Sequence, residues 1–541
     1  QDAVDFVNNI QAKVSAQEGN SLPVSAFTEY VDGTTPSGTS AYEKRGIAVN
    51  VPVWNPENCI QCNRCAYVCP HAAIRPVAMT EAEAAEAPAV LDMTGMKEYK
   101  FAIAVSALDC TGCGSCANVC PGKKGAKALA MENMEANVAS QKFFDYAVTL
   151  PEKEDVIAKF KENTVKGSQF KQPLLEFSGA CAGCGETPYA KLITQLFGDR
   201  MYIANATGCS SIWGNSSPST PYTVNAKGQG PAWSNSLFED NAEFGYGMLL
   251  AQKAIRDGLK TKVEAVMESE KASDEVKAAC KEWIDTFSVG ATNGAATDKL
   301  VAALEGCECD TCKDIVKNKD FLAKKSQWIF GGDGWAYDIG FGGVDHVLAS
   351  GKDINIMVFD TEVYSNTGGQ SSKSTPTGAI AQFAAGGKET KKKDMASIAM
   401  SYGYVYVAQI SMGADFNQTV KAIAEAEAYP GPSLIIAYAP CINHGIKKGM
   451  SKAQTEEELA VKCGYWHNFR FNPAAENKFT LDSKAPASED YQAFLDGEVR
   501  YNSLKRSNPE KAARLFAKNE NEAKERYTYL NKLITLYGKE D

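Results

Sequence analysis

Eight of the seventeen cysteines lie in two segments that repeat one spacing. Residues 59–70 read CIQCNRCAYVCP and residues 110–121 read CTGCGSCANVCP, so both follow C-x2-C-x2-C-x3-C-P. In such a pair, three thiolates of one segment hold a [4Fe–4S] cluster and the fourth ligates the cluster of the other segment. Zinc sites rarely repeat three closely spaced cysteines with a trailing Cys-Pro, so we expect two one-electron clusters. The expected ligands are Cys59, Cys62, Cys65 and Cys120 for one cluster, and Cys69, Cys110, Cys113 and Cys116 for the other.

A glycine-rich turn follows a predicted strand in residues 328–343, WIFGGDGWAYDIGFGG. Its glycines would let the backbone approach a phosphate closely. Asp333 lies among them, and a carboxylate repels a phosphate unless a divalent cation lies between the two. Magnesium fits that role because it binds oxygen ligands and often keeps phosphate oxygens among them.

The next predicted strand ends in a second turn that is rich in oxygen atoms, VFDTEVYSNTGGQ at residues 358–370. Gly-Asp-Gly followed by such a turn resembles the motif that binds thiamine diphosphate through magnesium. A lone Gly-Asp-Gly is also a common tight turn, so the prediction depends on the strand before it and on this second turn. Many thiamine enzymes end the motif in paired asparagines, whereas this chain has Thr361 and a later Asn366.

Two further cysteines, Cys181 and Cys184, lie in SGACAGCGETPYA at residues 178–190 and lack a nearby second pair. Ligands of open α/β sheets bind where the strands deliver their carboxyl ends. Cys209 follows the predicted strand MYIANA and Cys441 follows SLIIAYAP, so both should reach the crevice that holds Asp333. We therefore expect these four cysteines to bind a third cluster beside the cofactor.

The other five cysteines carry weaker signals. Cys280 and Cys463 fall in helical patterns, where we expect them to pack. Cys307, Cys309 and Cys312 form CECDTC in a polar excursion between sheet elements. They could hold a metal or remain free thiols, and the free-thiol interpretation is favoured.

Short apolar runs alternate with helical stretches over residues 173–470, which predicts βαβ units and a parallel sheet. The predicted fold is α/β, with a doubly wound parallel-sheet thiamine diphosphate-binding domain and a small α+β bacterial ferredoxin-like two-cluster domain. The predicted strands are 201–206, 328–332, 354–360, 404–410 and 433–440. The expected order is a linker or arm at 1–50, the two-cluster domain at 51–130, a helical connector at 131–172, the cofactor domain at 173–470 and a helical extension at 471–541.

The bulk properties exclude several classes of protein. The net charge of −10 over 541 residues argues against a general nucleic-acid binder. No apolar run reaches the roughly 18 residues that a membrane helix needs. Cysteines at metal-ligand spacings favour a reduced, cytoplasmic protein over a secreted disulfide scaffold. The chain begins QDAVDFVNNI without an initiator Met, so we expect a fragment or a processed piece.

Taken together, the motifs resemble the pyruvate:ferredoxin oxidoreductases. They are the repeated cysteine segment, CAGCGETPY, ATGCSSIWG, GGDGWAYDIG, DTEVYSNTGGQSSKSTPTG and APCINHG, in this order over nearly the whole chain. The resemblance implies reversible oxidative decarboxylation of pyruvate to acetyl-CoA and CO2. It also implies three [4Fe–4S] clusters, thiamine diphosphate, Mg²⁺ and an external ferredoxin or flavodoxin.

The same resemblance assigns the site residues. Cys181, Cys184, Cys209 and Cys441 would bind the cluster nearest the thiamine, and Asp333, Thr361 and the Val363 carbonyl would bind magnesium. Asn366 would also face the substrate as a catalytic residue. The expected cofactor lining is Glu186, Cys209, Gly332, Asp333, Gly334, Trp335, Thr361, Glu362, Val363, Tyr364, Ser365 and Asn366.

One departure from the family is large. Its members have an N-terminal half that binds the pyrimidine ring, the keto acid and coenzyme A, and that supplies the glutamate which activates the cofactor. We expect this chain to begin after that half, to need it as a partner and to form a homodimer. The alternatives are an oxidoreductase for another 2-oxoacid, such as 2-oxoglutarate, oxalate or an aryl pyruvate, and a non-catalytic iron–sulfur electron-transfer protein. The oxygen ligands around Asp333 argue against the second alternative, because an inert domain does not need them.

Overall fold

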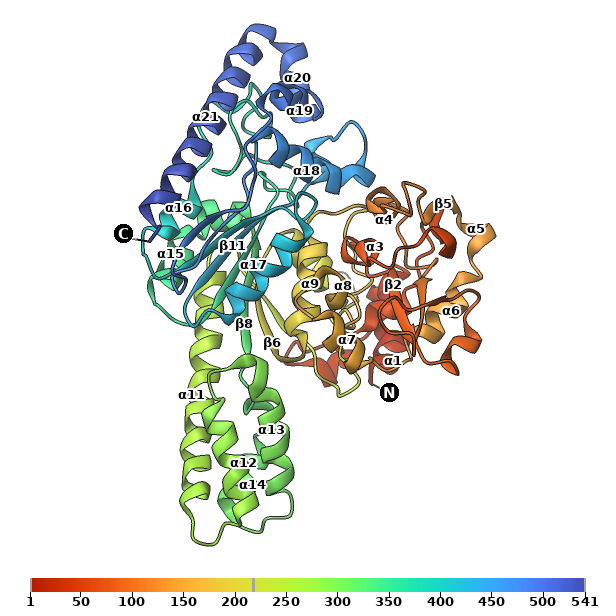
Figure 1. Ribbon diagram of the computed structural model, residues 1–541, viewed down its shortest axis with the longest axis vertical. Coiled ribbons are helices and arrows are strands. Elements are labelled where there is room, and N and C mark those ends of the chain that lie inside the picture. Colours follow the sequence, from red (N-terminus) through yellow and green to blue (C-terminus); the bar gives the residue numbers. More distant parts are fainter. Residues whose placement is uncertain (1, 217–218, 540–541) are drawn as a thin grey trace.

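An eight-stranded sheet forms the centre of the molecule (Figure 1). The computed structural model describes residues 2–216 and 219–539. The strands lie in the order β13-β12-β10-β11-β9-β8-β6-β7, and those from β10 to β7 are parallel. The predicted α/β fold with a parallel sheet is confirmed. The strands are β6 Met201–Ala206, β7 Ala232–Ser236, β8 Ser326–Gly332, β9 Asn355–Asp360, β10 Tyr406–Ile410, β11 Ser433–Tyr438, β12 Phe469–Phe471 and β13 Phe479–Leu481.

Helices cover both faces of this sheet. This burial explains why the sequence of strand β9 is apolar throughout. Ile356 and Val358 pack into the core on one face, whereas Met357 and Phe359 pack into the core on the other. A strand buried on both faces therefore reads as a continuous apolar run. One face is covered by α9 Thr187–Phe197 and α17 Phe416–Ala428, and the other by α11 Asn241–Glu268, α15 Phe341–Ala349 and α16 Met395–Met400.

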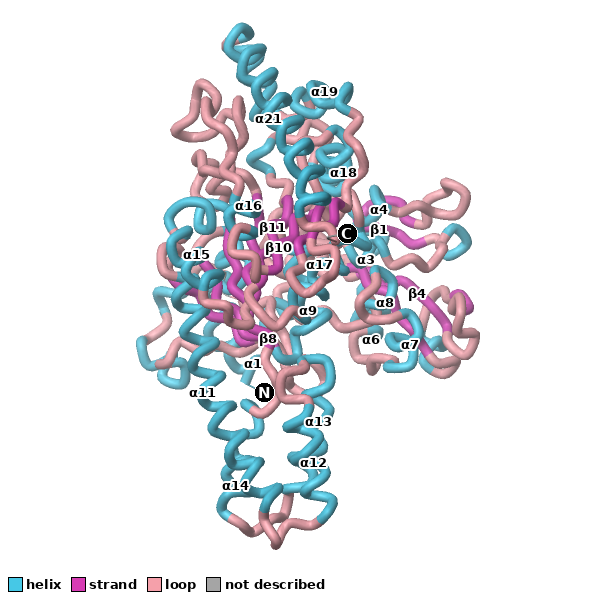
Figure 2. Tube along the Cα trace, turned by 60° about the vertical axis from the view of Figure 1, so that its left-hand side comes forward, coloured by secondary structure: helices cyan, strands magenta, loops and turns pink. Residues whose placement is uncertain are grey.

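A helical bundle projects away from the sheet (Figures 1 and 2). It consists of the distal part of α11 with α12 Asp274–Asp285, α13 Gly290–Leu304 and α14 Asp310–Lys317. Trp283, Leu300 and Ile315 belong to its own core, which also buries Cys280 as predicted. The sequence patterns did not reveal this bundle as a unit.

The two-cluster region is a small α+β unit beside the sheet (Figure 1). Strand β1 Asn50–Trp54 pairs antiparallel with β5 Leu129–Asn133, and β2 Ile74–Met79, β4 Lys100–Val105 and β3 Leu91–Asp92 form a second antiparallel sheet. Helices α3 Arg64–Tyr67 and α4 Ser115–Val119 lie within the cysteine segments. Because β5 pairs with β1, this unit continues to residue 133, past the expected boundary at 130.

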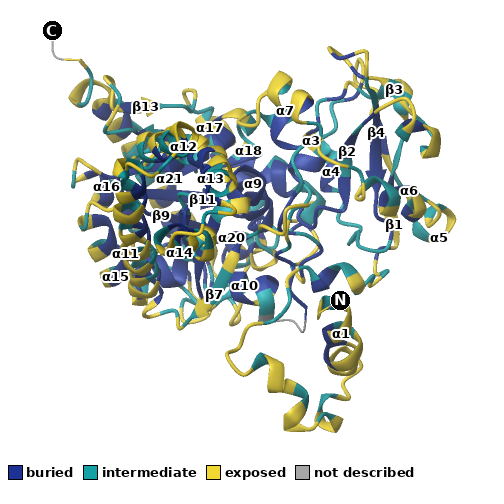
Figure 3. Cartoon of the chain, turned by 90° about the horizontal axis from the view of Figure 1, so that it is seen from below, coloured by how far each residue is buried: buried dark blue, intermediate teal, exposed yellow. Residues whose placement is uncertain are grey.

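Short helices fill the expected connector. They are α5 Met134–Asn137, α6 Ser140–Ala147, α7 Glu154–Phe160 and α8 Val165–Ser168. The amino-terminal segment begins with α1 Asp2–Phe6, a π-helix over Val7–Gln11 and α2 Ala12–Ser15, and it extends from the body as an exposed arm (Figure 3).

The sheet continues beyond residue 470, where a helical extension was expected to begin. Strands β12 and β13 pair antiparallel and β12 pairs with β10, so the hairpin closes that edge of the sheet. Helix α18 Ala453–Cys463 precedes it and buries Cys463, as predicted. The remaining chain is helical, with α19 Tyr491–Asp496, α20 Val499–Ser507 and the long α21 Pro509–Leu536. Among the described residues, no helix has both the length and the apolar character needed to cross a membrane.

The contact between α11 and the sheet leads to a first prediction. A Cβ atom on Gly245 would lie 2.5 Å from Ile329 Cγ1, so Gly245→Ala should destabilise the protein by about 1–3 kcal/mol through overpacking. Gly258 lies on the same helix with nothing within 4 Å of such an atom. Gly258→Ala should therefore stabilise by about 0.5–1 kcal/mol because alanine is the better helix former. Thermal unfolding followed by circular dichroism checks both, and equal midpoints for the two variants would contradict this packing.

Candidate active site

The three groups predicted to bind magnesium meet at the carboxyl ends of two adjacent strands. Asp333 directly follows β8, and Thr361 directly follows β9, which pairs with β8. The Thr361 hydroxyl oxygen lies 3.0 Å from Asp333 Oδ1 and 3.0 Å from the Val363 carbonyl oxygen. The structure thus brings a carboxylate, a hydroxyl and a carbonyl together, which suits a hard cation. Magnesium binding itself stays a prediction.

The electrostatics of this turn also fit a bound cation. Asp333 is fully buried, and its Oδ2 accepts a 2.6 Å hydrogen bond from the Ser372 hydroxyl. Burial, reinforced by the nearby Asp360 carboxylate, raises the pKa of Asp333 well above its usual range. Asp360 accepts hydrogen bonds from Ser374 and from Tyr337. Two buried carboxylates so close together need positive charge, which a divalent cation would supply.

The glycines of the turn divide into one that faces open space and one that is tightly packed. A Cβ atom on Gly332 would meet only the Phe359 carbonyl oxygen, at 3.8 Å, so this position leaves room for a phosphate. A Cβ atom on Gly334 would lie 2.4 Å from the Tyr364 ring. Trp335 is buried against the same turn. These predicted lining residues therefore surround the space next to Asp333.

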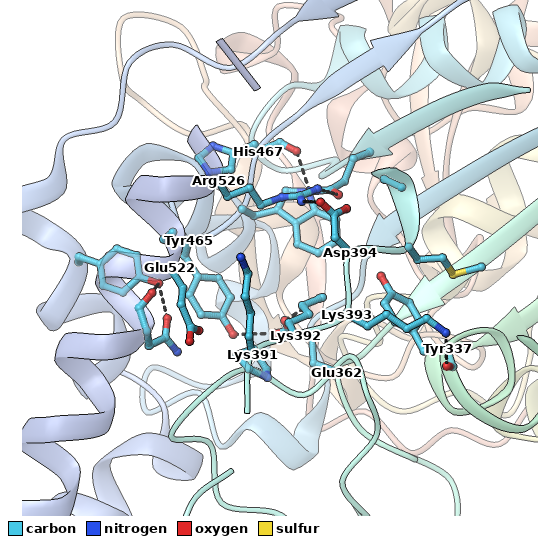
Figure 4. Close-up of a pocket in the computed structure, with 18 residues that line it drawn as sticks. Tyr337, Glu362, Lys391, Lys392, Lys393, Asp394, Tyr465, His467, Glu522 and Arg526 are labelled. Atoms are coloured by element: carbon cyan, nitrogen blue, oxygen red, sulfur yellow. Dashed lines mark hydrogen bonds and ion pairs between the residues drawn. The ribbon is translucent and has the colours of Figure 1, made fainter. Parts of the chain in front are cut away.

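The side chain of Glu362, another residue predicted to line the cofactor, instead binds basic residues of the protein. Its carboxylate accepts hydrogen bonds of 2.9 Å from Lys392 and from Arg500, and one of 2.7 Å from the Tyr465 hydroxyl. Burial alone would raise the pKa of Glu362, but Lys392 and Arg500 more than offset it and lower the pKa to about 2. Figure 4 shows Glu362, Lys392 and Tyr465 around a pocket next to α21. The side chain of Glu362 thus anchors the turn from behind.

This anchor holds an unusual backbone conformation. Glu362 has φ of +61°, a left-handed value that non-glycine residues adopt at an energetic cost. Lys392 bridges the Glu362 carboxylate to that of Asp360 at 2.9 Å each, on either side of Thr361. The charge of Lys392 therefore stabilises the turn that positions the Thr361 hydroxyl and the Val363 carbonyl.

Replacing this lysine provides a test of the anchor. Lys392→Met should lower the thermal midpoint by several degrees and weaken magnesium-dependent thiamine diphosphate binding at least about tenfold, because two buried carboxylates lose their shared cation. The exposed neighbour Lys391 is the matched control, and Lys391→Met should change neither value. Calorimetric titration and thermal unfolding measure the two effects. Unchanged binding in Lys392→Met would show that the turn is held by other contacts.

The loops that carry the third set of cysteines lie side by side. The Gly185 N–H donates a 3.1 Å hydrogen bond to the Pro440 carbonyl, which places the loop of Cys184 against the loop of Cys441. A Cβ atom on Gly185 would lie only 2.5 Å from the Pro440 nitrogen. Burial and the nearby Glu186 raise the pKa of Cys184, and the Cys441 thiolate adds to this effect. The two loops therefore present their thiols to a common space.

Cys209 joins this group and also contacts the cofactor turn. Its Sγ lies 3.0 Å from the Ser365 hydroxyl, and the Ser365 carbonyl accepts a 3.0 Å hydrogen bond from the Asn443 amide. Burial raises the pKa of Cys209, and the thiolates of Cys184 and Cys441 raise it further. The exposed Asn366 follows Ser365 directly. Cys209 therefore connects the third set of cysteines with the turn that is expected to bind the thiamine.

Glu186 is buried close to Cys184 and Cys209. Trp213 donates a 2.7 Å hydrogen bond to its carboxylate. Burial raises its pKa to about 7. Cys181, by contrast, is exposed and acts electrostatically on Cys441. All four cysteines and Glu186 therefore belong to one neighbourhood, and their ligand roles stay predictions.

The eight cysteines of the repeated segments border two separate small cavities. The first cavity is lined by Cys59, Cys62, Cys65 and Cys120, and the second by Cys69, Cys110, Cys113 and Cys116. These are the two sets expected if the fourth cysteine of each segment ligates the cluster of the other segment. Backbone N–H groups of Gln61, Gly112 and Ala128 point to the sulfur atoms of Cys59, Cys110 and Cys120, respectively. Such donors stabilise thiolates, although cluster binding itself stays a prediction.

One of these cavities lies next to the third set of cysteines. Burial raises the pKa of Cys113, and a hydrogen bond from the Gly183 N–H partly offsets that effect. Gly183 lies between Cys181 and Cys184. His71, which lines the same cavity as Cys113, lies 2.9 Å from the Ala180 carbonyl oxygen. The cavity of Cys69, Cys110, Cys113 and Cys116 therefore adjoins the cofactor region.

Several residues of the site were not identified from the sequence. Ser372 and Ser374 support Asp333 and Asp360, and the motif SSKSTPTG contained them without indicating which carboxylate each would meet. Lys392 stands in a run of three lysines that resembles a solvated surface. Arg500 comes from α20 and has no local signal that would connect it with Glu362.

Comparisons with protein families cover the chain in three segments. Residues 316–437 match the thiamine pyrophosphate enzyme, C-terminal TPP binding domain. Residues 48–124 match a 4Fe-4S dicluster domain, and residues 1–48 match a domain of unknown function named EKR. The two cofactor classes predicted from the motifs are thus confirmed at the level of domains.

The similar proteins are oxidoreductases. The chain is 58% identical to a pyruvate-flavodoxin oxidoreductase of Enterobacter agglomerans and 56% identical to a pyruvate:ferredoxin oxidoreductase of Moorella thermoacetica. Each alignment covers 98% of this chain and 46% of the relative, so the chain spans about half the length of the curated relatives it matches. A solved 2-oxoglutarate:ferredoxin oxidoreductase from Magnetococcus marinus aligns with 16% identity and a TM-score of 0.28, over 49% of this chain and 65% of that chain, too low to support an argument.

Proposed function

We propose that this chain is the C-terminal part of a pyruvate:flavodoxin or pyruvate:ferredoxin oxidoreductase. Its sequence is 58% and 56% identical to parts of two such enzymes, over 98% of its length. The complete enzyme oxidises pyruvate to acetyl-CoA and CO2 and delivers single electrons to ferredoxin or flavodoxin. One observation supports this proposal most directly. Asp333, Thr361 and Val363 lie together, and the same turn contacts Cys209 through Ser365. A site for a metal and a diphosphate would therefore lie next to a thiolate ligand of a cluster.

The residues at the strand ends have distinct roles in this proposal. Asp333, Thr361 and the Val363 carbonyl hold magnesium and through it the diphosphate, while Gly332 leaves the phosphate its space. Thiamine diphosphate, when bound, supplies the chemistry that stabilises a carbanion at the substrate. The exposed Asn366 faces the substrate at the mouth of the site.

The three cysteine sets form a series in this proposal. The set of Cys181, Cys184, Cys209 and Cys441 adjoins the thiamine site through Ser365. His71, which lines the cavity of the second set, lies 2.9 Å from the Ala180 carbonyl oxygen, which supports placing Cys69, Cys110, Cys113 and Cys116 next in the series. The remaining set, Cys59, Cys62, Cys65 and Cys120, is then the outermost. Clusters held by these sets accept one electron at a time, which suits one-electron acceptors.

The surface supports the need for the rest of the enzyme. Val24 and Val31 on the amino-terminal arm are 91% and 85% exposed, and Phe383 is 93% exposed on a loop that contacts Gly369 in the cofactor region. Apolar side chains so exposed suit an interface that another part of the enzyme covers. In this proposal that part binds pyruvate and coenzyme A, and the assembled enzyme is a cytoplasmic homodimer.

The acceptor protein has a candidate docking point. Lys123 and Lys124 are exposed directly after the second cysteine segment. Lys127, the third lysine there, instead donates hydrogen bonds to the carbonyls of Ala117 and Asn118 at the end of α4. The two free lysines would attract an acidic ferredoxin or flavodoxin by long-range electrostatics.

The main test of this function is reconstitution. Residues 1–541 alone, loaded with iron, thiamine diphosphate and magnesium, should not reduce methyl viologen with pyruvate and coenzyme A. In this proposal the base that activates the cofactor belongs to the remaining part of the enzyme, and general base catalysis contributes about 10²–10⁴ in rate. Supplying the remaining part of the enzyme, joined or separate, should restore turnover.

Two outcomes would contradict the proposal. Turnover by the isolated chain would remove the need for a partner, and a reconstituted enzyme that oxidises another 2-oxoacid but not pyruvate would change the substrate. Reduction of the isolated chain by dithionite serves as the control that its redox groups are intact.

The metal–diphosphate site is tested through Asp333. In the complete enzyme, Asp333→Ala should lose thiamine diphosphate binding and pyruvate oxidation while its iron content stays unchanged, because the cysteine sets do not use this carboxylate. Asp333→Asn should be intermediate, since it keeps an oxygen ligand but loses the charge. Calorimetric titration with thiamine diphosphate and magnesium measures the binding. Tight binding by Asp333→Ala would refute the assignment.

A further inference from the structure

Three cysteines that the proposed function does not use lie at the far end of the helical bundle. Helix α13 ends at Leu304 and α14 begins at Asp310, and the connection between these helices contains Cys307 and Cys309 while Cys312 lies in the first turn of α14. This connection is at the end of the bundle that points away from the sheet (Figures 1 and 2). Any role of these thiols is therefore separate from the thiamine site.

The sulfur atoms of the three residues converge. Those of Cys307, Cys309 and Cys312 all lie within 4.8 Å of one another, and those of Cys309 and Cys312 are 3.0 Å apart. Over residues 2–216 and 219–539, no other group of three or more histidine, cysteine or acidic residues is so compact. The cysteines expected to surround iron–sulfur clusters are spaced more widely. A tetrahedral zinc ion with Zn–S bonds of about 2.3 Å places its sulfur ligands about 3.8 Å apart, which suits this compact group.

Backbone contacts support the shape of this group. Gly306 adopts φ of +82°, which turns the chain after α13, and the Cys307 N–H donates a 3.1 Å hydrogen bond to the Leu304 carbonyl. Cys309 is the N-cap of α14, where its sulfur accepts a 3.2 Å hydrogen bond from the Cys312 N–H. A donor aimed at sulfur favours the thiolate, which is the form that binds metals. The loop is therefore arranged for ligation in advance.

The surroundings favour a single ion at the surface over a disulfide. Cys312 is buried in the core of the bundle, Cys309 is exposed and Cys307 is intermediate. A disulfide would join two of these sulfurs and leave the third beside them unused. Glu308, the residue between the first two cysteines, is engaged by Lys313 at 2.7 Å. An ion held by the three thiols would thus keep one coordination position open to water.

We propose that Cys307, Cys309 and Cys312 bind one Zn²⁺, with water as the fourth ligand, and that this ion fastens α14 to the end of α13. Zinc is the ion chosen because it combines thiolate ligands with tetrahedral geometry and needs no redox partner. Its binding stabilises the end of the bundle, since the ligands join the connection that follows α13 to the first turn of α14.

The first experiment uses the unaltered chain. Iron-replete, fully reduced protein is treated anaerobically with one equivalent of zinc chloride or with EDTA, then alkylated with iodoacetamide and mapped by mass spectrometry. Zinc should protect all three cysteines from alkylation by at least about tenfold and slow hydrogen exchange of the α14 backbone amides. Equal alkylation with and without zinc would overturn the proposal, as would a Cys309–Cys312 disulfide in the protein as isolated, before any reductant is added.

The second experiment compares variants by elemental analysis. The combined variant Cys307→Ser, Cys309→Ser, Cys312→Ser should lose about one zinc per chain and keep its iron. Cys280→Ala, which alters a buried cysteine of the same bundle outside the group, should keep both metals. Zinc retained by the triple variant would overturn the proposal. Iron content confirms that each variant is folded, and neither experiment depends on pyruvate oxidation.

Discussion

The burial of negative charge at two adjacent strand ends is the constraint on which the cofactor region depends. Asp333 and Asp360 are both fully buried, and their strands are hydrogen-bonded neighbours. Carboxylates in such a place must be protonated, hydrogen-bonded or matched by cations. Ser372 and Ser374 supply hydroxyl donors to these carboxylates, and Lys392 supplies a cation to Asp360. In the proposed function, a magnesium ion beside the diphosphate would supply further positive charge.

This arrangement explains why the turn after β9 has its unusual shape. Thr361 and Val363 must direct two oxygen atoms toward Asp333, and the residue between them takes a left-handed conformation to do so. The strain is offset by the ion pairs that Glu362 makes with Lys392 and Arg500. Residues from α20 and from the loop before α16 are thereby tied to the geometry of a site that they do not enter.

Close packing between backbone segments positions the cysteines of the third set. The loops of Cys184 and Cys441 approach so closely that a side chain on Gly185 would clash with Pro440, and His71 lies 2.9 Å from the Ala180 carbonyl oxygen. Distances between redox groups are thus set by glycine contacts between loops. The zinc site proposed in the bundle follows a different principle, because there a helix N-terminus and one turn bring neighbouring cysteines together within six residues of sequence.

The sequence by itself determined the features that depend on residues close together in the chain. The repeated cysteine spacing, the apolar runs of β9 and β11 and the Gly-Asp-Gly turn each depend on residues a few positions apart, and each appears in the structure where the sequence predicted it. Strands β12 and β13 were not predicted, because three-residue strands show no usable alternation. Only the tertiary structure decided that Arg500 would meet Glu362, that Gly183 would meet Cys113 and that Cys307 would converge with Cys309 and Cys312. The first two contacts join residues 138 and 70 positions apart, and the third depends on a single left-handed glycine. Local patterns carry no information about the first two meetings, since packing between distant segments selects them.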